Sequence, residues 1–252
     1  MIEQAYTQGE ALGLAVWGED EAGPYQTRPY AGQSWSVQGH PQHYPHEYVR
    51  TGTAKMMTLF HPQSGQVRLK GTSSTANAIL HPWMKAELEA ILAQLPEKEE
   101  LTDPVENRAE WERWQDGLAT RITLPQTLPR LRMRLILDNL SGHKSVDLVL
   151  WLFAHGIMPL YTPLGGSWLN MTESVQRILK RRALEGSYPR TEDQMIGWFE
   201  AVARHWNSDP TPFVWGGKRQ ARRQRARHRR LHRLGGSAAY TRRPVRRKWQ
   251  VA

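Results

Sequence analysis

The stretch Arg134-Leu-Ile-Leu-Asp138-Asn-Leu-Ser-Gly-His143-Lys joins a short apolar run to a carboxylate and a turn. The apolar run starts at residue 132 and predicts a buried strand that ends at Asp138. Residues 146–154 are apolar almost all round and predict a buried helix, and residues 158–161 predict another short strand. This order of strand, helix and strand predicts a right-handed crossover between parallel strands.

Upstream of this unit, short apolar runs separated by turn residues predict further strands. They lie at residues 11–17, 54–60 and 67–69, and apolar residues at helical spacing follow over 77–95. Strands therefore come first, and helices alternate with strands afterwards. This order predicts an α/β fold with a mixed central sheet flanked by helices.

Residues 96–130 differ in character from their surroundings, because they are charged and contain four prolines. Within them, residues 105–122 form a candidate helix that carries Trp111, Trp114 and Leu118 on one face. We interpret this stretch as an insertion that packs on the edge of the domain.

The end of the chain is strongly basic. Fourteen of the 34 Lys and Arg residues lie in residues 218–252, which contain no Asp or Glu. The other 20 face 24 acidic residues in 1–217, so this body has a net charge of about −4 while the whole chain has +10. We expect one domain over 1–217 and a disordered basic tail over 218–252. Such a tail suits a polyanion such as DNA, although a solvated tail that binds nothing specific is the alternative.

Composition excludes several classes of protein. The chain has no cysteine, so disulfides and zinc–thiolate sites are absent from it. The first residues lack the basic start and apolar run of a signal peptide, and the longest apolar stretch, 148–153, is too short to cross a bilayer. The default expectation is a cytoplasmic protein.

Three carboxylates are candidates for one cation site. Asp20 follows the first predicted strand, Asp138 ends a later one, and Glu173 lies just inside a helical pattern, with thirty-four residues between Asp138 and Glu173. If the two strands are neighbours, the three side chains meet where ligands bind in α/β sheets. Carboxylates that meet repel one another unless cations lie among them, and Mg²⁺ prefers oxygen ligands.

Each carboxylate also has a purely structural interpretation. Asp138 would form a turn with the asparagine that follows it, and Glu173 would complete a capping box with Asn170. Asp20 belongs to an acidic triplet that would suit a solvated turn, and its neighbours Glu19 and Glu21 are alternative ligands. The three signals are informative because they occur together and at the ends of elements.

The residues carry a family resemblance. The runs Leu135–His143, Tyr161–Pro163 and Ser167-Trp-Leu-Asn-Met-Thr-Glu173 resemble DDE transposases of the mariner superfamily, closest to the bacterial insertion-sequence branch. The spacing from Asp138 to Glu173 matches that superfamily, and Trp17–Gly23 resembles its first acidic motif. The resemblance covers about residues 11–217, except 96–130.

This resemblance implies a ribonuclease-H-like fold, whose sheet has an antiparallel start and a parallel continuation. It implies cleavage at transposon ends and strand transfer into target DNA, with Mg²⁺, or Mn²⁺ in its place, as two ions. Asp20, Asp138 and Glu173 map to the three catalytic metal ligands. A homodimer at the bacterial nucleoid is implied as well. The candidate DNA contacts are His143, Lys144, Arg222, Arg223, Arg225, Arg229 and Arg230.

The family normally carries helix-turn-helix modules before its catalytic domain, whereas the first strand is expected here near residue 11. We therefore expect a catalytic domain without those modules, with a separate helix-turn-helix product as one partner. Two alternatives stay open: a catalytically silent remnant that only binds DNA, and a structure-specific nuclease on the same fold.

Overall fold

The computed structural model describes residues 1–33, 36–41, 43–96, 103–116, 118, 121–217 and 224. The chain divides into two compact units, Met1–Phe213 and Val214–Ala252. Apart from Gln224, the expected tail 218–252 lies outside the described residues, and with it the candidate DNA contacts Arg222, Arg223, Arg225, Arg229 and Arg230. The boundary at residue 217 stays a prediction.

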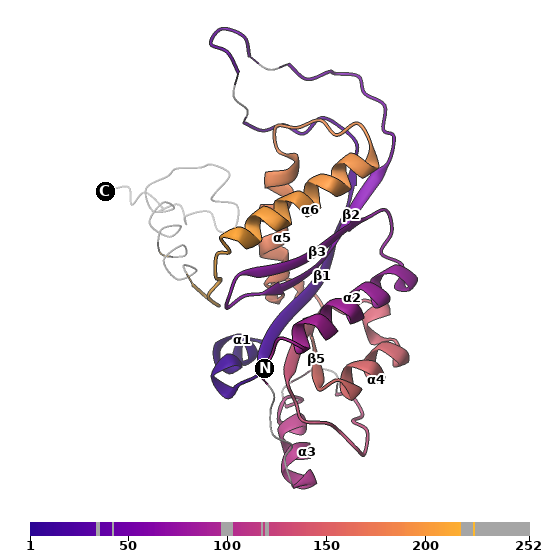
Figure 1. Cartoon of the computed structure of the whole chain (residues 1–252), viewed down its shortest axis with the longest axis vertical. Coiled ribbons are helices and arrows are strands. Elements are labelled where there is room, and N and C mark those ends of the chain that lie inside the picture. The colour runs from indigo at the N-terminus through magenta and orange to yellow at the C-terminus, as the bar shows by residue number, and fades with distance from the viewer. Residues whose placement is uncertain are drawn as a thin grey trace, which may run out of the picture. The chain divides into compact units, whose positions relative to one another are not determined.

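The first unit is built on a five-stranded mixed sheet in the order β3-β2-β1-β4-β5. β1, β2 and β3 are antiparallel to one another in turn, and β4 and β5 continue parallel to β1. The expected α/β fold, a mixed central sheet flanked by helices in the ribonuclease-H-like arrangement, is confirmed (Figure 1). The strands are β1 (Ala15–Gln26), β2 (Thr53–His61), β3 (Gln66–Thr72), β4 (Met133–Leu137) and β5 (Ile157–Tyr161).

β1 is longer than the sequence suggested, and this corrects the expected place of Asp20. The apolar run ends at Trp17, but the strand continues to Gln26. The acidic triplet therefore lies within the strand, with Asp20 opposite Thr58 of β2, and does not form a solvated turn. The backbone explains the difference, because β2 supplies an antiparallel partner along this half of β1 whatever the side chains are.

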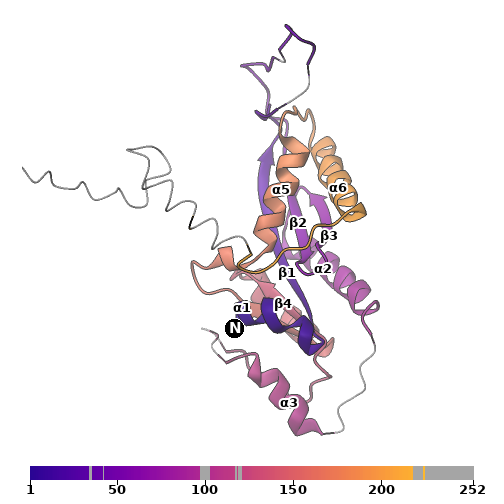
Figure 2. The same cartoon turned by 90° about the vertical axis from the view of Figure 1, so that its left-hand side faces the viewer.

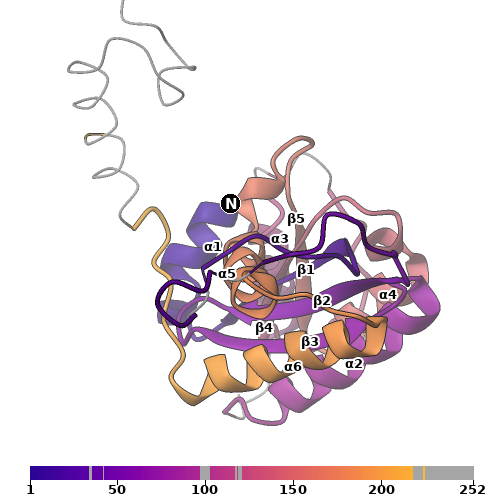
Figure 3. The ribbon, with the colours of Figure 1, turned by 90° about the horizontal axis from the view of Figure 1, so that it is seen from above.

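Helices cover both faces of the sheet (Figures 2 and 3). Side chains alternate along β2, so that Met57 and Leu59 pack with α2 while Met56 and Phe60 pack toward α5 and α6. Buried residues of α4 join the core on the α2 side. The helices are α1 (Ile2–Gln8), α2 (Asn77–Leu92), α3 (Pro104–Arg113), α4 (Val146–Ala154), α5 (Thr172–Leu184) and α6 (Glu192–Ser208).

The stretch 96–130 contains α3, which is shorter than the expected helix over 105–122. Trp111 and Trp114 are buried, and the ring of Trp111 lies edge-on to Phe153 of α4 with centroids 5.6 Å apart. The Trp111 Nε1–H donates to the carbonyl of Pro129 at 2.9 Å. The two tryptophans therefore fix α3 to the core. Their helical spacing in the sequence had placed them on one face.

Among the described residues, no helix combines the length and the apolar character that crossing a bilayer requires.

A glycine lets α5 begin close to β1. A Cβ atom at Gly18 would lie 2.5 Å from Thr172 Oγ1 and 2.6 Å from Asn170 Oδ1, and both of those side chains are buried. Only a residue without a side chain allows this approach. Because Gly18 lies two residues before Asp20, the same contact sets the distance between the acidic part of β1 and the start of α5.

We predict that Gly18→Ala lowers the free energy of unfolding by about 1–3 kcal/mol, because a methyl group must displace buried atoms. The matched control is Gly197→Ala in α6, where an added Cβ meets no atom within 4 Å. That control should gain about 0.5–1 kcal/mol, since alanine favours a helix over glycine. Urea unfolding of both variants measures the difference, and equal stability of Gly18→Ala and wild type would contradict the close approach.

Candidate active site

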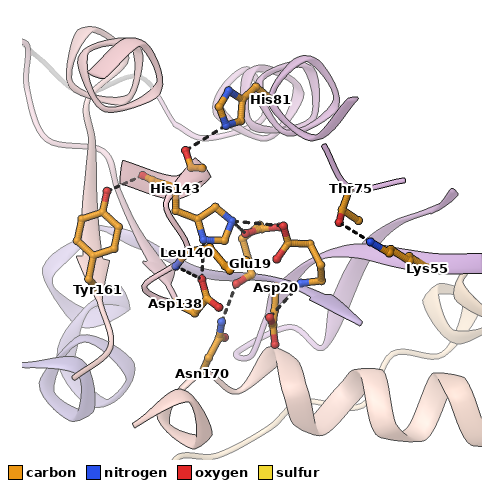
Figure 4. Close-up of polar contacts among 12 residues, drawn as sticks. Glu19, Asp20, Lys55, Thr75, His81, Asp138, Leu140, His143, Tyr161 and Asn170 are labelled. Atoms are coloured by element: carbon orange, nitrogen blue, oxygen red, sulfur yellow. Dashed lines mark hydrogen bonds and ion pairs between the residues drawn. The ribbon is translucent and has the colours of Figure 1, made fainter. Parts of the chain in front are cut away.

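Asp20 and Asp138 come together through the parallel pairing of β1 with β4. The paired residues run from Ala15 with Met133 to Gly18 with Ile136. Continuing this register by two residues places Asp20 opposite Asp138, at the point where β4 has ended. The two carboxylates, both labelled in Figure 4, interact through their charges. Asp138 keeps 25% of its side chain exposed. The expected meeting of these residues is thus what the strand register produces.

Glu173 reaches the same place from the first turn of α5. Its charge acts on Asp20, so the three predicted carboxylates lie near one another. A carboxylate in the first turn is also stabilised by the helix dipole. The capping-box alternative does not describe this helix, because the N-cap is Met171 and it makes no side-chain cap hydrogen bond.

Asn170 and Gln176 attach the start of α5 to the backbone of β1. Asn170 is buried, and its Nδ2 donates to the carbonyl of Glu19 at 2.6 Å, while its Oδ1 accepts from the Thr172 N–H at 3.1 Å. The Gln176 Nε2 donates to the carbonyl of Asp20 at 2.9 Å. These bonds lie on both sides of Glu173 in the sequence, so they orient the turn that carries it. In the sequence, Asn170 carries only the signal of a helix cap, and no local pattern points to Gln176.

The site has a strong excess of negative charge. Burial raises the pKa of Asp20 to about 8, and the charges of Glu19, Asp138, Glu173 and Glu21 raise it in the same direction. Such a donor set, of oxygen atoms only and partly open to solvent, fits a hard divalent cation. The residues present therefore fit the metal that the resemblance implies.

The acidic triplet divides between the two faces of β1. Because strand side chains alternate, Asp20 faces Asp138 and Glu173, while Glu19 and Glu21 face the other side. There the Nε2 of His143 lies 3.0 Å from Glu19 Oε2 and 3.7 Å from Glu21 Oε1. Among the described residues, Glu19, Glu21 and His143 are the group whose possible ligand atoms all lie within 4.8 Å of one another.

His143 connects this inner group to the candidate metal site. Its Nδ1 lies 2.8 Å from Asp138 Oδ1 (Figure 4). Burial alone would lower the pKa of His143, but the charge of Glu19, the hydrogen bonds with Asp138 and Glu19, and the charge of Glu21 outweigh it and raise the pKa to about 11. Each ring nitrogen lies within 3.0 Å of a carboxylate oxygen, an arrangement that suits a protonated imidazole. We therefore interpret the inner group as an ion-pair cluster and not as a second metal centre.

The same contacts act on Asp138. Burial would raise the pKa of this carboxyl, yet the hydrogen bonds from His143 and from the Leu140 N–H hold it below its ordinary range. Asp138 is thus kept ionised, which a metal ligand requires.

The position of His143 corrects one expectation. His143 was a candidate DNA contact, but its side chain is fully buried, so it contacts carboxylates and offers no surface to DNA. Its loop is fixed by Tyr161, whose hydroxyl donates to the His143 carbonyl at 2.7 Å, and by His81, whose Nε2 lies 3.1 Å from the Gly142 carbonyl. Lys144 is exposed beside it and stays a predicted contact.

A mixed sheet of this order, with carboxylates gathered where two parallel strands separate, defines a ribonuclease-H-like domain with a site for divalent-cation chemistry. The family model described as DDE superfamily endonuclease matches residues 15–196. The chain belongs to this family, and the matched range contains Asp20, Asp138 and Glu173.

No curated protein matches the chain. Among solved structures, the chain is similar to the catalytic core domain of BIV integrase, with 10% sequence identity and a TM-score of 0.40 over 80% of this chain and 88% of that chain.

From the ion-pair cluster we predict an effect on the free energy of unfolding. His143→Ala should lower the free energy of unfolding by about 3–5 kcal/mol, because it leaves the buried carboxylate of Glu19 without its partner. The double variant Glu19→Gln/His143→Ala should lose less than the sum of the two single variants. Urea unfolding gives all three values.

Lys144→Ala is the control, since that exposed side chain should change stability by less than about 0.5 kcal/mol. Additive losses in the double variant would show that Glu19 and His143 do not stabilise each other.

Proposed function

We propose that this chain is a transposase of the mariner superfamily, of the bacterial insertion-sequence type. It would cleave DNA at transposon ends and join the freed end to target DNA. The observation that carries this proposal is the convergence of Asp20 from β1, Asp138 from the end of β4 and Glu173 from the start of α5. Membership of an endonuclease family with this site supports DNA as the substrate.

The three carboxylates would hold two Mg²⁺ ions, for which Mn²⁺ can substitute. When bound, such ions supply Lewis acidity and neutralise charge in phosphoryl transfer. In cleavage, a water oxygen forms a bond to phosphorus while the bond to the 3′-oxygen breaks, and that oxygen takes a proton. In strand transfer, the freed 3′-hydroxyl attacks a phosphodiester of the target and displaces its 3′-oxygen.

The protein's own contribution is to position these groups. His143 keeps Asp138 ionised and fixes its direction, while Asn170 and Gln176 hold the turn of Glu173 against β1. Positioning and electrostatics are what phosphoryl transfer mainly requires from a protein. Lys144 and the arginines of the tail would contact DNA phosphates, and a homodimer, with or without a helix-turn-helix partner, would hold two ends at the nucleoid.

We predict that Asp20→Asn, Asp138→Asn and Glu173→Gln each reduce metal-dependent cleavage by at least about 10²-fold, the scale expected when one preorganised charge is lost. Asp147→Asn is the matched control, because this exposed carboxylate lies on α4 outside the site. The assay follows nicking of labelled transposon-end DNA and the appearance of joined strands. A variant that retains full activity removes its residue from the site.

The same assay separates the alternatives. Nicking of any branched or RNA-containing duplex without joined products would indicate a structure-specific nuclease. Wild-type protein that binds DNA but never nicks it with Mg²⁺ or Mn²⁺ would indicate a catalytically silent remnant.

Metal binding can be tested without activity. We predict that Mg²⁺ or Mn²⁺ at about a hundred times its Kd stabilises the wild-type fold by about 2.7 kcal/mol, because only the folded state assembles the carboxylates. Asp20→Asn should be more stable than wild type without metal, since it removes a carboxyl group whose ionised form is disfavoured by burial and by the neighbouring carboxylates, and should gain little from metal. Thermal unfolding with and without metal measures both effects, and an equal gain in wild type and variant would contradict the assignment.

A further inference from the structure

A second polar site lies at the opposite end of α5 from Glu173. It is a cavity of about 580 Å³, and its lining residues come from the segment between β1 and β2 and from the turn between α5 and α6. Figures 1 and 2 show both segments at the same end of the unit. The lining residues are Glu47, Tyr48, Val49, Thr51, Tyr188 and Arg190, and we call this the tyrosine–arginine pocket.

Arginines and tyrosines are paired around this pocket. The guanidinium of Arg190 lies 3.9 Å from the ring centroid of Tyr188, and that of Arg50 lies 5.9 Å from the ring centroid of Tyr48. A hydrogen bond with Arg50 lowers the pKa of the Tyr48 hydroxyl, and the charges of Arg50 and Arg28 add to this effect. Arg190 thus lines the pocket, Arg50 and Arg28 lie beside Tyr48 of its lining, and the lining contains a single carboxylate, Glu47.

The walls of the pocket are held by hydrogen bonds between distant segments. The Thr51 hydroxyl donates to the Arg190 carbonyl at 2.8 Å, and the Thr51 N–H donates to the Thr27 hydroxyl at 2.8 Å. The Tyr30 N–H donates to the carbonyl of Ser187 at 2.9 Å. These bonds hold Thr51 and the backbone of Arg190 in place before any ligand binds, which reduces the entropy lost on binding.

The distance from the carboxylates follows from the length of α5. This helix has thirteen residues, so its axis spans about 20 Å between the turn of Glu173 and the pocket. Arg177 and Arg181 are exposed along it. A nucleic-acid strand advances 3.4 Å per nucleotide, so the pocket lies about six nucleotides from the carboxylates.

We propose that the tyrosine–arginine pocket binds the phosphate backbone of the DNA that flanks the cleaved position, with Arg50 and Arg190 as the phosphate-binding groups. Guanidinium groups bind phosphate oxygens in pairs of hydrogen bonds, and tyrosine rings beside them suit the sugar and base of the same nucleotide. The pocket would hold the duplex in register over the carboxylates without reading its sequence. This assignment rests on the proposed function, because it takes DNA as the substrate.

The first test measures binding of the full chain to a short duplex without divalent metal, between about 50 and 200 mM salt. The variant Arg50→Gln/Arg190→Gln should weaken binding by about tenfold for each arginine lost. The slope of log K against log salt should fall by about 1.8, which is about 0.9 for each released counterion. The control Arg113→Gln/Arg204→Gln removes the same charge from exposed positions on α3 and α6.

The second test locates the DNA directly. Because the chain has no cysteine, Val49→Cys at the 77% exposed rim of the pocket can carry a single photo-crosslinker. We expect crosslinks about six nucleotides from the cleaved phosphate, following the helix length. Val105→Cys on α3, where the valine is 74% exposed, is the control and should give few crosslinks.

The outcomes separate the two proposals. Equal affinities and slopes in the two double variants, or equal crosslinking from the two cysteines, would overturn the pocket even if wild-type protein cleaves DNA. A pocket-dependent slope and crosslink in a protein that never cleaves would support the pocket and overturn the proposed activity. Circular dichroism and thermal unfolding establish that each variant is folded.

Discussion

The parallel pairing of β1 with β4 is the constraint on which the site depends. The pairing runs to Gly18 and Ile136 and then β4 ends, while β1 continues beside β2. Asp20 and Asp138 are therefore placed opposite each other in a region without further parallel ladder, where their side chains can face a ligand. Gly18 allows α5 to be the third element of the site, because the missing side chain of this glycine lets α5 begin against the same part of β1.

Gathering carboxylates in this way is energetically unfavourable, and one residue reduces this penalty. The acidic triplet of β1 directs Asp20 to one face and Glu19 to the other, and Glu19 is fully buried. His143 lies between the faces and contacts both Glu19 and Asp138. A buried charge is tolerable when it is paired, so the imidazolium offsets Glu19 and keeps Asp138 ionised at once. The remaining excess of charge lies around Asp20, where the donor set suits a cation.

Local patterns in the sequence predicted much of this arrangement. Short apolar runs located β4 and β5, helical spacing located α2 and α5, and the element order gave a mixed sheet with flanking helices. The spacing of Asp138 and Glu173 pointed to a shared site because both lie at the ends of such elements. These predictions succeeded where the residues themselves carry the signal, as in the buried run 133–137.

Other features could not be read from local patterns. The polar second half of β1 looks like a turn, and only the backbone ladder of β2 makes it a strand. His143 looks like an exposed residue after a turn, and only packing against α2 and β5 turns it inward to the carboxylates. The pocket at the end of α5 joins residues about 140 positions apart, such as Thr51 and Arg190. The sequence by itself therefore determined which elements form and which carboxylates they carry, because periodicity and chain order are local. Only the tertiary structure decided the partner of each charge, because burial and pairing depend on segments that meet after folding.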